Sequence, residues 1–126
     1  MEIKTLFTDK APVAIGPYSQ GKIANGFLYL SGQIPVDSKS GEVTGSTIEE
    51  QTRTVLDNIE VLLNAAGTDF SAVVKTTCLL STMADFGAFN KLYAEKFITN
   101  PARSCFAVKE LPKGVLVEVE TIACLN

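Results

Sequence analysis

The sequence contains no histidine and no tryptophan, and it has only three cysteines, which lie far apart. Without histidine the protein cannot carry a Ser-His-Asp triad, a Cys-His dyad, a histidine acid/base pair or a histidine zinc site. Cys78, Cys105 and Cys124 form no C-x-x-C motif, and such an odd, sparse count predicts free thiols in a reducing cytosol. We therefore expect a cytoplasmic protein without a metal site.

Long apolar runs and an excess of positive charge are also missing. No apolar run approaches the roughly 20 residues that span a bilayer, and residues 1–5 lack the basic and apolar regions of a secretory signal. The net charge is −3, which offers no general electrostatic attraction to nucleic acid or to an anionic membrane surface. We expect neither as a partner.

The remaining composition is that of an ordinary globular chain. Of the 126 residues, 46% are hydrophobic and 20% are charged, which excludes the low-hydrophobicity signature of disorder. This length matches the commonest domain size, and the sequence shows no repeat or linker. We expect one domain over residues 1–126.

Two segments carry helical signals. Thr47-x-x-Glu50 matches a capping box, and apolar residues follow at spacings of three, four and seven up to Gly67, which predicts a helix of about 20 residues. Thr82-x-x-Asp85 opens a second helix, whose apolar stripe is aromatic. Asn100 and Pro101 end it, because a residue before proline avoids the helical region.

Four β-rich segments predict strands at residues 27–31, 72–81, 103–108 and 115–124, and a further strand near the N-terminus is left open. Residues 11–19 and 35–45 are predicted loops. Long helices between strands indicate crossover connections, and the short turn at residues 111–114 favours a hairpin of the last two strands. The predicted fold is therefore α+β, a mixed sheet with two helices packed on one face.

The sheet is predicted to be too apolar to leave its second face in water. The residues behind this expectation are Leu28, Leu30, Val74, Leu80, Val117 and Val119. We expect an oligomer that buries the second face.

The predicted hairpin would group three charged side chains. With Val108 opposite Val115, Cys105 would lie opposite Glu118 and Arg103 opposite Glu120, all on one face. Taken alone, the residues favour a cross-strand ion pair between Arg103 and one of the glutamates. The functional alternative is a small-anion site, in which the guanidinium grips a carboxylate and a glutamate acts as general base.

Other features carry weaker signals. Gly16-Pro17-Tyr18 and Ser31-Gly32-Gln33 are typical of turns, although a glycine amide and a tyrosine hydroxyl can also contact a ligand. Cys105 is expected to be a small buried residue, because no histidine could activate it. Asn90 alone indicates nothing. The aromatic residues of the second helix are expected in the core, and they are Phe86, Phe89, Tyr93 and Phe97.

Four ordered sequence blocks together resemble a known family. They are Ala14-Ile15-Gly16-Pro17-Tyr18-Ser19-Gln20, Ser31-Gly32-Gln33-Ile34-Pro35, Pro101-Ala102-Arg103-Ser104 and Val117-Glu118-Val119-Glu120. They are similar, in order and over nearly the whole chain, to the signatures of the reactive-intermediate deaminases (RidA, also called YjgF-like proteins). Asp85-Phe86, Asn90 and Tyr93 also match. The link from Phe97 to Pro101 is shorter than in many relatives.

The resemblance implies a chorismate-mutase-like fold and a homotrimer with sheets facing inward and sites between subunits. It implies hydrolysis of 2-imino acids, such as 2-iminopropanoate and 2-iminobutanoate, or their enamine tautomers, to 2-oxo acids and ammonia, without a cofactor. Arg103 would bind the substrate carboxylate, and Glu118 would orient or deprotonate the attacking water. The backbone of Gly32 and Cys105 would hold the ligand, and further pocket positions would be Tyr18, Ser31 and Asn90.

Two other functions stay open at this point. Some members of the family carry the name of a ribonuclease or translation inhibitor, which the acidic charge and the absence of histidine disfavour. A module that binds small carboxylates, or acts as a chaperone, without turnover would use the same Arg103 pocket.

Overall fold

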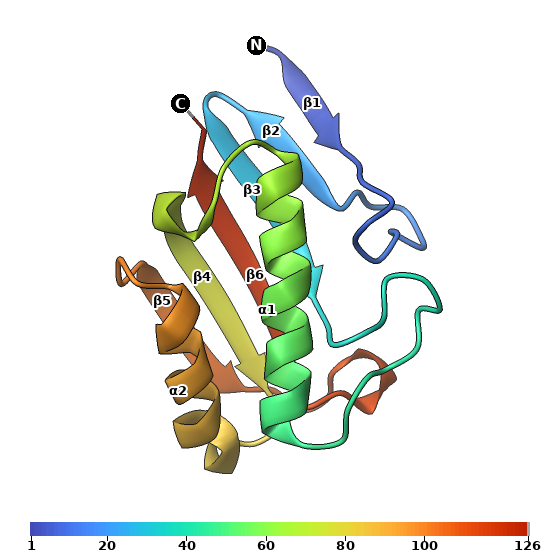
Figure 1. The fold of residues 1–126 in the computed structure, drawn as a ribbon, viewed down its shortest axis with the longest axis vertical. Helices are drawn as coiled ribbons and strands as arrows, with labels where there is room; N and C mark the ends of the chain where they lie inside the picture. The colour runs from blue at the N-terminus through green and yellow to red at the C-terminus, as the bar shows by residue number, and fades with distance from the viewer. Residues whose placement is uncertain (126) are drawn as a thin grey trace.

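A six-stranded mixed sheet with two helices on one face makes up the computed structural model, which describes residues 1–125 (Figure 1). The strands are β1 (Ile3–Leu6), β2 (Gly21–Ala24), β3 (Phe27–Gln33), β4 (Val73–Leu80), β5 (Ala102–Ala107) and β6 (Val117–Cys124). The helices are α1 (Ile48–Ala65) and α2 (Phe86–Lys96), and short 3₁₀ turns lie before β4 at Phe70–Ala72, before α2 at Met83–Asp85 and between β5 and β6 at Pro112–Gly114. The predicted α+β class and the two helices on one face are confirmed.

The helix α1 begins and ends as its sequence predicts. Thr47 accepts from the backbone N–H of Glu50, and the Glu50 carboxylate accepts from the N–H of Thr47, so the capping box forms. Gly67 follows the last turn with φ +83°, a left-handed conformation that glycine adopts without steric cost. The apolar face of α1 packs on the centre of the sheet, chiefly on β6 and β3.

The start of α2 differs slightly from the prediction. The Thr82 hydroxyl caps the 3₁₀ turn Met83–Asp85, and regular α-helix begins only at Phe86. The helix ends at Lys96, and Asn100 then takes a positive φ of +54° before Pro101. This sharp turn returns the chain to β5 at the edge of the sheet, directly beneath α2 (Figure 1).

The predicted hairpin of the last two strands is wrong. The strand order is β1-β2-β3-β6-β4-β5, so β6 lies between β3 and β4, and β5 pairs in parallel with β4. Arg103 therefore lies beside Thr76, not opposite Glu120, and Cys105 lies beside Cys78, not opposite Glu118. Every second residue of β6 is buried, as suits a central strand, whereas no residue of β5 is buried, as suits an edge strand.

Most of the residues that predicted an apolar second face lie on the other face of the sheet, in the core. Of the six apolar residues behind it, only Val74 is exposed; the others are buried in the main core, and they are Leu28, Leu30, Leu80, Val117 and Val119. The face away from the helices, called the open face below, carries Tyr29, Phe106 and both glutamates of β6 instead.

The N-terminal half differs from the prediction in its strands and in the pairing of β3. The sequence left one further strand near the N-terminus open, and the structure has two, β1 and β2. The second was not predicted because Gly21–Ala24 is short and lacks a β-branched run. The pairing of β3 with β6 is interrupted between Leu30 and Gln33, so Ser31 and Gly32 form an irregular step in the strand. Within residues 1–125, no helix is long and apolar enough to cross a membrane.

Candidate active site

The predicted site residues separate into two groups. The first, called the arginine cluster, lies on the helix-covered face at the β5 edge and consists of Phe86, Asn90, Tyr93, Arg103 and Cys105. The second, called the glutamate cluster, lies on and beside the open face and consists of Tyr18, Ser31, Gly32, Glu118 and Glu120.

In the arginine cluster, Arg103 projects from β5 toward α2. Its Nη1 donates a hydrogen bond of 2.7 Å to the Asn90 side-chain oxygen, and its guanidinium carbon lies 4.7 Å from the ring centre of Tyr93. The half-buried ring of Phe86 lies 5.4 Å away. A neutral amide and two rings thus hold a side chain that is itself only half-buried.

The predicted ion pair of Arg103 does not form. Among residues 1–125 the ion pairs join Lys4 to Glu2 and Lys96 to Glu60, and neither includes Arg103. Asn90 accepts one hydrogen bond but carries no charge, so the positive charge of Arg103 stays uncompensated while several of its N–H donors remain available. A concavity of about 420 Å³ adjoins the guanidinium, lined by Asn90, Tyr93, Ala94, Phe97, Asn100, Pro101 and Arg103. This arrangement favours the small-anion alternative.

In the glutamate cluster, Glu118 of β6 packs against the backbone of β3. A Cβ atom added to Gly32 would collide with the Glu118 carboxylate, lying 2.9 Å from its carboxyl carbon. Gly32 is therefore the residue that lets the Glu118 side chain lie flat on the irregular step of β3. This close approach was not predicted, because it depends on the interrupted register.

The environment of Glu118 raises its pKa. Partial burial disfavours the charged carboxylate most, and the negative charge of Glu120, two residues along the same face of β6, adds to the effect. Among residues 1–125 Glu118 has no cationic partner. A carboxylate with a raised pKa is a better proton acceptor than an exposed one, so Glu118 is suited to act as a general base.

Tyr18 and Ser31 complete the glutamate cluster. The Ser31 hydroxyl donates to the backbone oxygen of Ser19 at 2.6 Å, and the Ser31 N–H donates to the Gln20 oxygen, which ties the loop before β2 to β3. Tyr18 is 55% exposed, so its hydroxyl is free to contact a ligand. Tyr18, Ser31 and Glu120 line an open groove of about 750 Å³.

The two clusters do not meet within one chain. Arg103 and Cys105 share the helix-covered face with Thr76 and Cys78, whereas Glu118 lies on the opposite face of the sheet. The predicted grouping of Arg103, Glu118 and Glu120 on one face is therefore wrong. The fold brings Asn90 to Arg103, and separately brings Tyr18, Ser31 and Gly32 to the glutamates.

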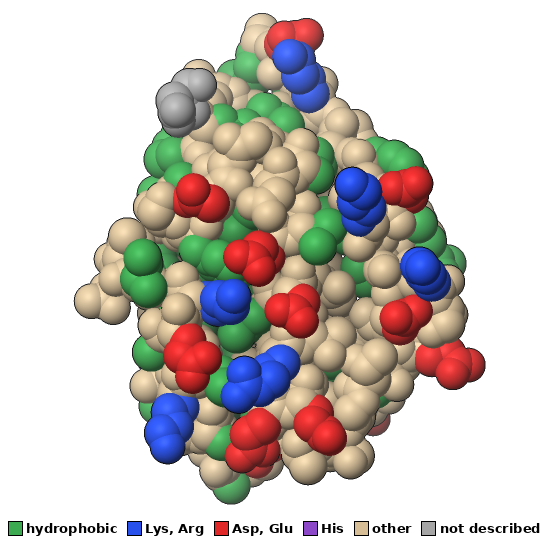
Figure 2. All heavy atoms as spheres, in the orientation of Figure 1, with side chains coloured by type: hydrophobic (Ala, Val, Ile, Leu, Met, Phe, Trp, Pro, Cys, Tyr) green, Lys and Arg blue, Asp and Glu red, His purple; other side chains and the backbone are tan. Residues whose placement is uncertain are grey.

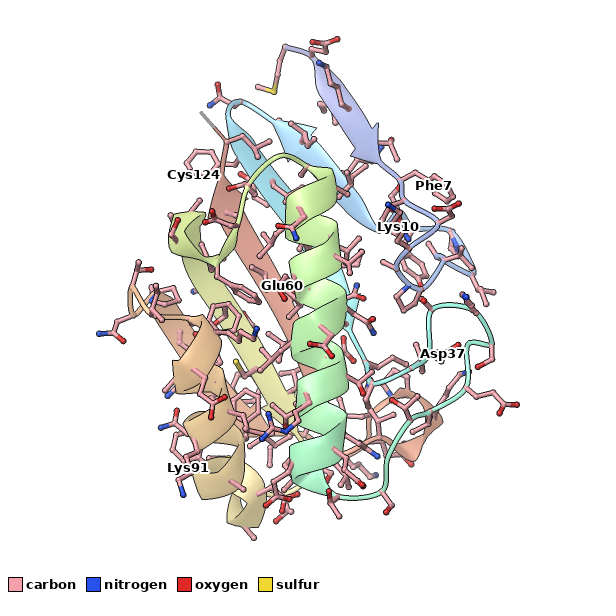
Figure 3. All side chains as sticks on the ribbon, in the orientation of Figure 1. Phe7, Lys10, Asp37, Glu60, Lys91 and Cys124 are labelled. Atoms are coloured by element: carbon pink, nitrogen blue, oxygen red, sulfur yellow. The ribbon has the colours of Figure 1, made fainter. Side chains whose placement is uncertain are left out.

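The cysteines do not form a reactive centre. Burial raises the pKa of the Cys78 thiol to about 12 and also raises that of Cys105, so neither is a thiolate at neutral pH. Cys124 lies at the end of β6, at the other end of the molecule from Lys91 on α2 (Figure 3). Cys105 was expected to be buried, but it is only half-buried because β5 is an edge strand; its raised pKa agrees with the expectation that it is not a nucleophile. Across residues 1–125, no group of three His, Cys, Asp or Glu could hold a metal ion.

The sequence interpretation missed the role of two aromatic residues. Phe86 and Tyr93 were assigned to the core, but both rings also contact the guanidinium of Arg103. Their spacing of seven on α2 places them on the same helix face as Asn90, four residues after Phe86. That spacing could have indicated a shared neighbour.

Known proteins match the chain over nearly its whole length. The model of the family described as "Endoribonuclease L-PSP" matches residues 8–125. A Lactococcus lactis protein named as a regulator, AldR, is 51% identical over 122 residues, covering 96% of this chain and 97% of that protein. The human 2-iminobutanoate/2-iminopropanoate deaminase is 43% identical over 121 residues, covering 95% of this chain and 88% of that protein.

Solved structures show the same fold. The crystal structure of E. coli TdcF with bound serine superposes with a TM-score of 0.91 at 36% identity, covering 98% of this chain and 99% of that chain.

Proposed function

The chain belongs to the endoribonuclease L-PSP family, also known as the YjgF/RidA family, and we propose that it hydrolyses reactive 2-imino acids. The substrates would be 2-iminobutanoate, 2-iminopropanoate and their 2-enamine tautomers, and the products would be 2-oxo acids and ammonia. One observation carries the proposal: Arg103 is fixed by neutral partners, forms no ion pair among residues 1–125 and borders a concavity. A guanidinium in such a site is suited to bind an anion.

In the proposed reaction, the Arg103 guanidinium binds the substrate carboxylate and holds the imine carbon beside a water molecule. Glu118 accepts a proton from this water as its oxygen attacks the imine carbon. The imine nitrogen takes up a proton from solvent, which gives a carbinolamine. Glu118 then returns its proton to the amino nitrogen, the C–N bond breaks, and ammonia leaves as the hydroxyl group loses its proton and the C=O bond forms. Imines are already reactive toward water, so positioning and one general base suffice.

We further propose that the complete site forms between two copies of this chain in a homotrimer. The sheet separates Arg103 from Glu118 within one chain, and no single small substrate reaches both. The arginine cluster of one copy would therefore face the glutamate cluster of the next. The exposed edge strand β5 and the exposed Tyr29 and Phe106 on the open face support such an assembly.

Two of the compared proteins support the substrate class. The human relative is named for the two imino acids proposed here, and the E. coli relative was crystallised with serine, an amino acid with a free carboxylate. For this chain, both facts fit an arginine that binds a small carboxylate.

The family description provides the competing function, cleavage of RNA. Figure 2 shows Lys and Arg interspersed with Asp and Glu over the helix-covered face, so this face offers no continuous basic stripe for a phosphate backbone. With a net charge of −3 and no histidine, the chain is poorly suited to that reaction. The other alternative is a module that binds small carboxylates without turnover, and an assay of imine hydrolysis distinguishes it from the proposed enzyme.

The test generates 2-iminobutanoate in situ with a threonine dehydratase and follows its disappearance with and without the protein. We expect acceleration by the natural protein, and loss of acceleration with Arg103→Ala and with Glu118→Gln. Glu118→Gln should still bind 2-oxobutanoate, whereas Arg103→Ala should not. Lys109→Ala, an exposed lysine near the end of β5, is the matched control for loss of a surface cation. Binding without acceleration would favour the binding module, and RNA cleavage without imine hydrolysis would favour the ribonuclease.

A further inference from the structure

The guanidinium of Arg103 lies against an aromatic stack that continues into the core. The Tyr93 ring, 4.7 Å from the guanidinium carbon, stacks on Phe97 at a centroid distance of 4.2 Å and an angle of 26°. Phe97 in turn meets Phe70 edge-on at 5.0 Å. Phe97 is 1% exposed, so the far end of the stack cannot move without disturbing the core.

A buried hydrogen bond fixes the Tyr93 ring from the other side. Its hydroxyl lies 2.7 Å from the Thr76 hydroxyl on β4, the residue directly beside Arg103 in the sheet. The Cys78 thiol also approaches the Thr76 hydroxyl, at 3.8 Å. Tyr93 is thereby tied to the same strand pair that carries Arg103, and the ring and the guanidinium keep one relative position.

Phe86 contacts the guanidinium separately, at the start of α2. Its ring is half-buried and lies 5.4 Å from the guanidinium carbon. A cation close to an aromatic ring is attracted by the negative face of that ring. Because Asn90 accepts only one hydrogen bond, it cannot by itself prevent the long arginine side chain from rotating.

We propose that Phe86 and Tyr93 are positioning residues, whose rings hold the Arg103 guanidinium ready for a carboxylate. A free arginine loses considerable side-chain entropy when it is fixed on binding. The two rings and Asn90 remove most of that freedom before the ligand arrives, so binding costs less. This inference rests on the proposed function only for the identity of the ligand, a small 2-oxo or 2-imino carboxylate.

The experiment measures binding of 2-oxobutanoate by calorimetry and, in parallel, the NMR signal of the Arg103 Nε–H group. In Phe86→Leu we expect the dissociation constant to rise about threefold to tenfold, the range of a partly exposed cation–π contact. The Arg103 signal should lose the part of its chemical shift that the ring causes. In the imine assay, KM should rise by the same factor while kcat stays within about twofold, the signature of lost ground-state binding.

Two further variants separate positioning from stability. Tyr93→Phe keeps the ring but loses the bond to Thr76, and we expect a smaller rise in the dissociation constant than for Phe86→Leu. Phe70→Leu removes a ring from the far end of the same stack, so it should lower Tm while leaving the binding of 2-oxobutanoate unchanged.

The outcomes distinguish this inference from the proposed function. Natural protein that binds 2-oxobutanoate without hydrolysing imines would overturn the proposed function and leave the positioning role testable by binding. Phe86→Leu that binds as tightly as the natural protein, or Phe70→Leu that weakens binding equally, would overturn the positioning role. Natural protein that binds no 2-oxobutanoate would overturn both.

Discussion

The arginine cluster and the glutamate cluster are built in contrasting ways. Arg103 is held by a hydrogen bond and two rings, and its position is determined by α2 and β4 together. Glu118 has a backbone beneath it at Gly32, no cationic partner among residues 1–125, and a second carboxylate nearby. The arginine cluster presents a fixed positive charge without a negative partner, and the glutamate cluster presents a carboxylate without a positive partner. The sheet separates the two clusters within one chain.

The largest effect is expected at Gly32, where the Glu118 side chain leaves no space for an added Cβ atom. In Gly32→Ala the new Cβ would collide with the Glu118 carboxylate, so Glu118 must leave its position. We expect a loss of imine hydrolysis of about 100-fold, the effect of displacing a catalytic group by about 1 Å. Gly87→Ala, where nothing lies near the added Cβ, is the matched control. Unimpaired turnover in Gly32→Ala would show that the position of Glu118 does not matter.

The next largest effect is expected when a negative charge is added to the arginine cluster. Asn90→Asp would place a carboxylate 2.7 Å from the Arg103 guanidinium, where it pairs with the arginine and repels an incoming carboxylate. We expect 2-oxobutanoate to bind about 10-fold to 100-fold more weakly, while Tm does not fall. Asn90→Ala, which loses the hydrogen bond but adds no charge, should weaken binding less. Equal affinities for the two variants would show that Arg103 does not bind the carboxylate through its free charge.

These two clusters also show how far sequence reasoning reaches. Local signals were sufficient for α1, with its cap at Thr47, and for most strands. They singled out Arg103 as a charged residue on a short strand, whereas only the family resemblance separated Glu118 from Glu120, and the roles of both residues stay predictions. Local signals were insufficient for the face on which each residue lies, because that depends on strand order. Two strands joined by a short turn usually pair, but here β6 inserts between β3 and β4. The exposed Ala102 and Ser104 of β5, against the buried Val117 and Val119 of β6, were the signal for an edge strand beside a central one.

A smaller effect concerns the pH dependence of the glutamate cluster. As a general base, Glu118 acts only when deprotonated, so the rate should fall as the pH drops through its pKa. Burial and the Glu120 charge both raise this pKa. In Glu120→Gln the repulsion is gone, the pKa of Glu118 falls, and the acid limb of kcat/KM should move to lower pH. An acid limb that moves to higher pH, or not at all, would contradict the coupling.

The smallest effect is expected in Cys105→Ala. The thiol lies next to the arginine cluster, but burial raises its pKa, so it does not act as a nucleophile. Only its backbone is expected to contact the ligand. We expect kcat/KM to stay within about twofold of the natural protein, as measured in the dehydratase-coupled assay. A loss comparable with that of Arg103→Ala would assign a chemical role to the thiol.

The most direct test of the account combines two inactive variants in one oligomer. When Arg103→Ala and Glu118→Gln chains are co-expressed, a site built between copies regains an intact arginine from one chain and an intact glutamate from the other. Random assembly of equal amounts would restore about a quarter of the sites, so the mixture should recover about a quarter of the natural activity while each variant alone stays inactive. A co-expressed mixture that remains as inactive as its components, although the mixed oligomers have formed, would contradict a site shared between the two clusters.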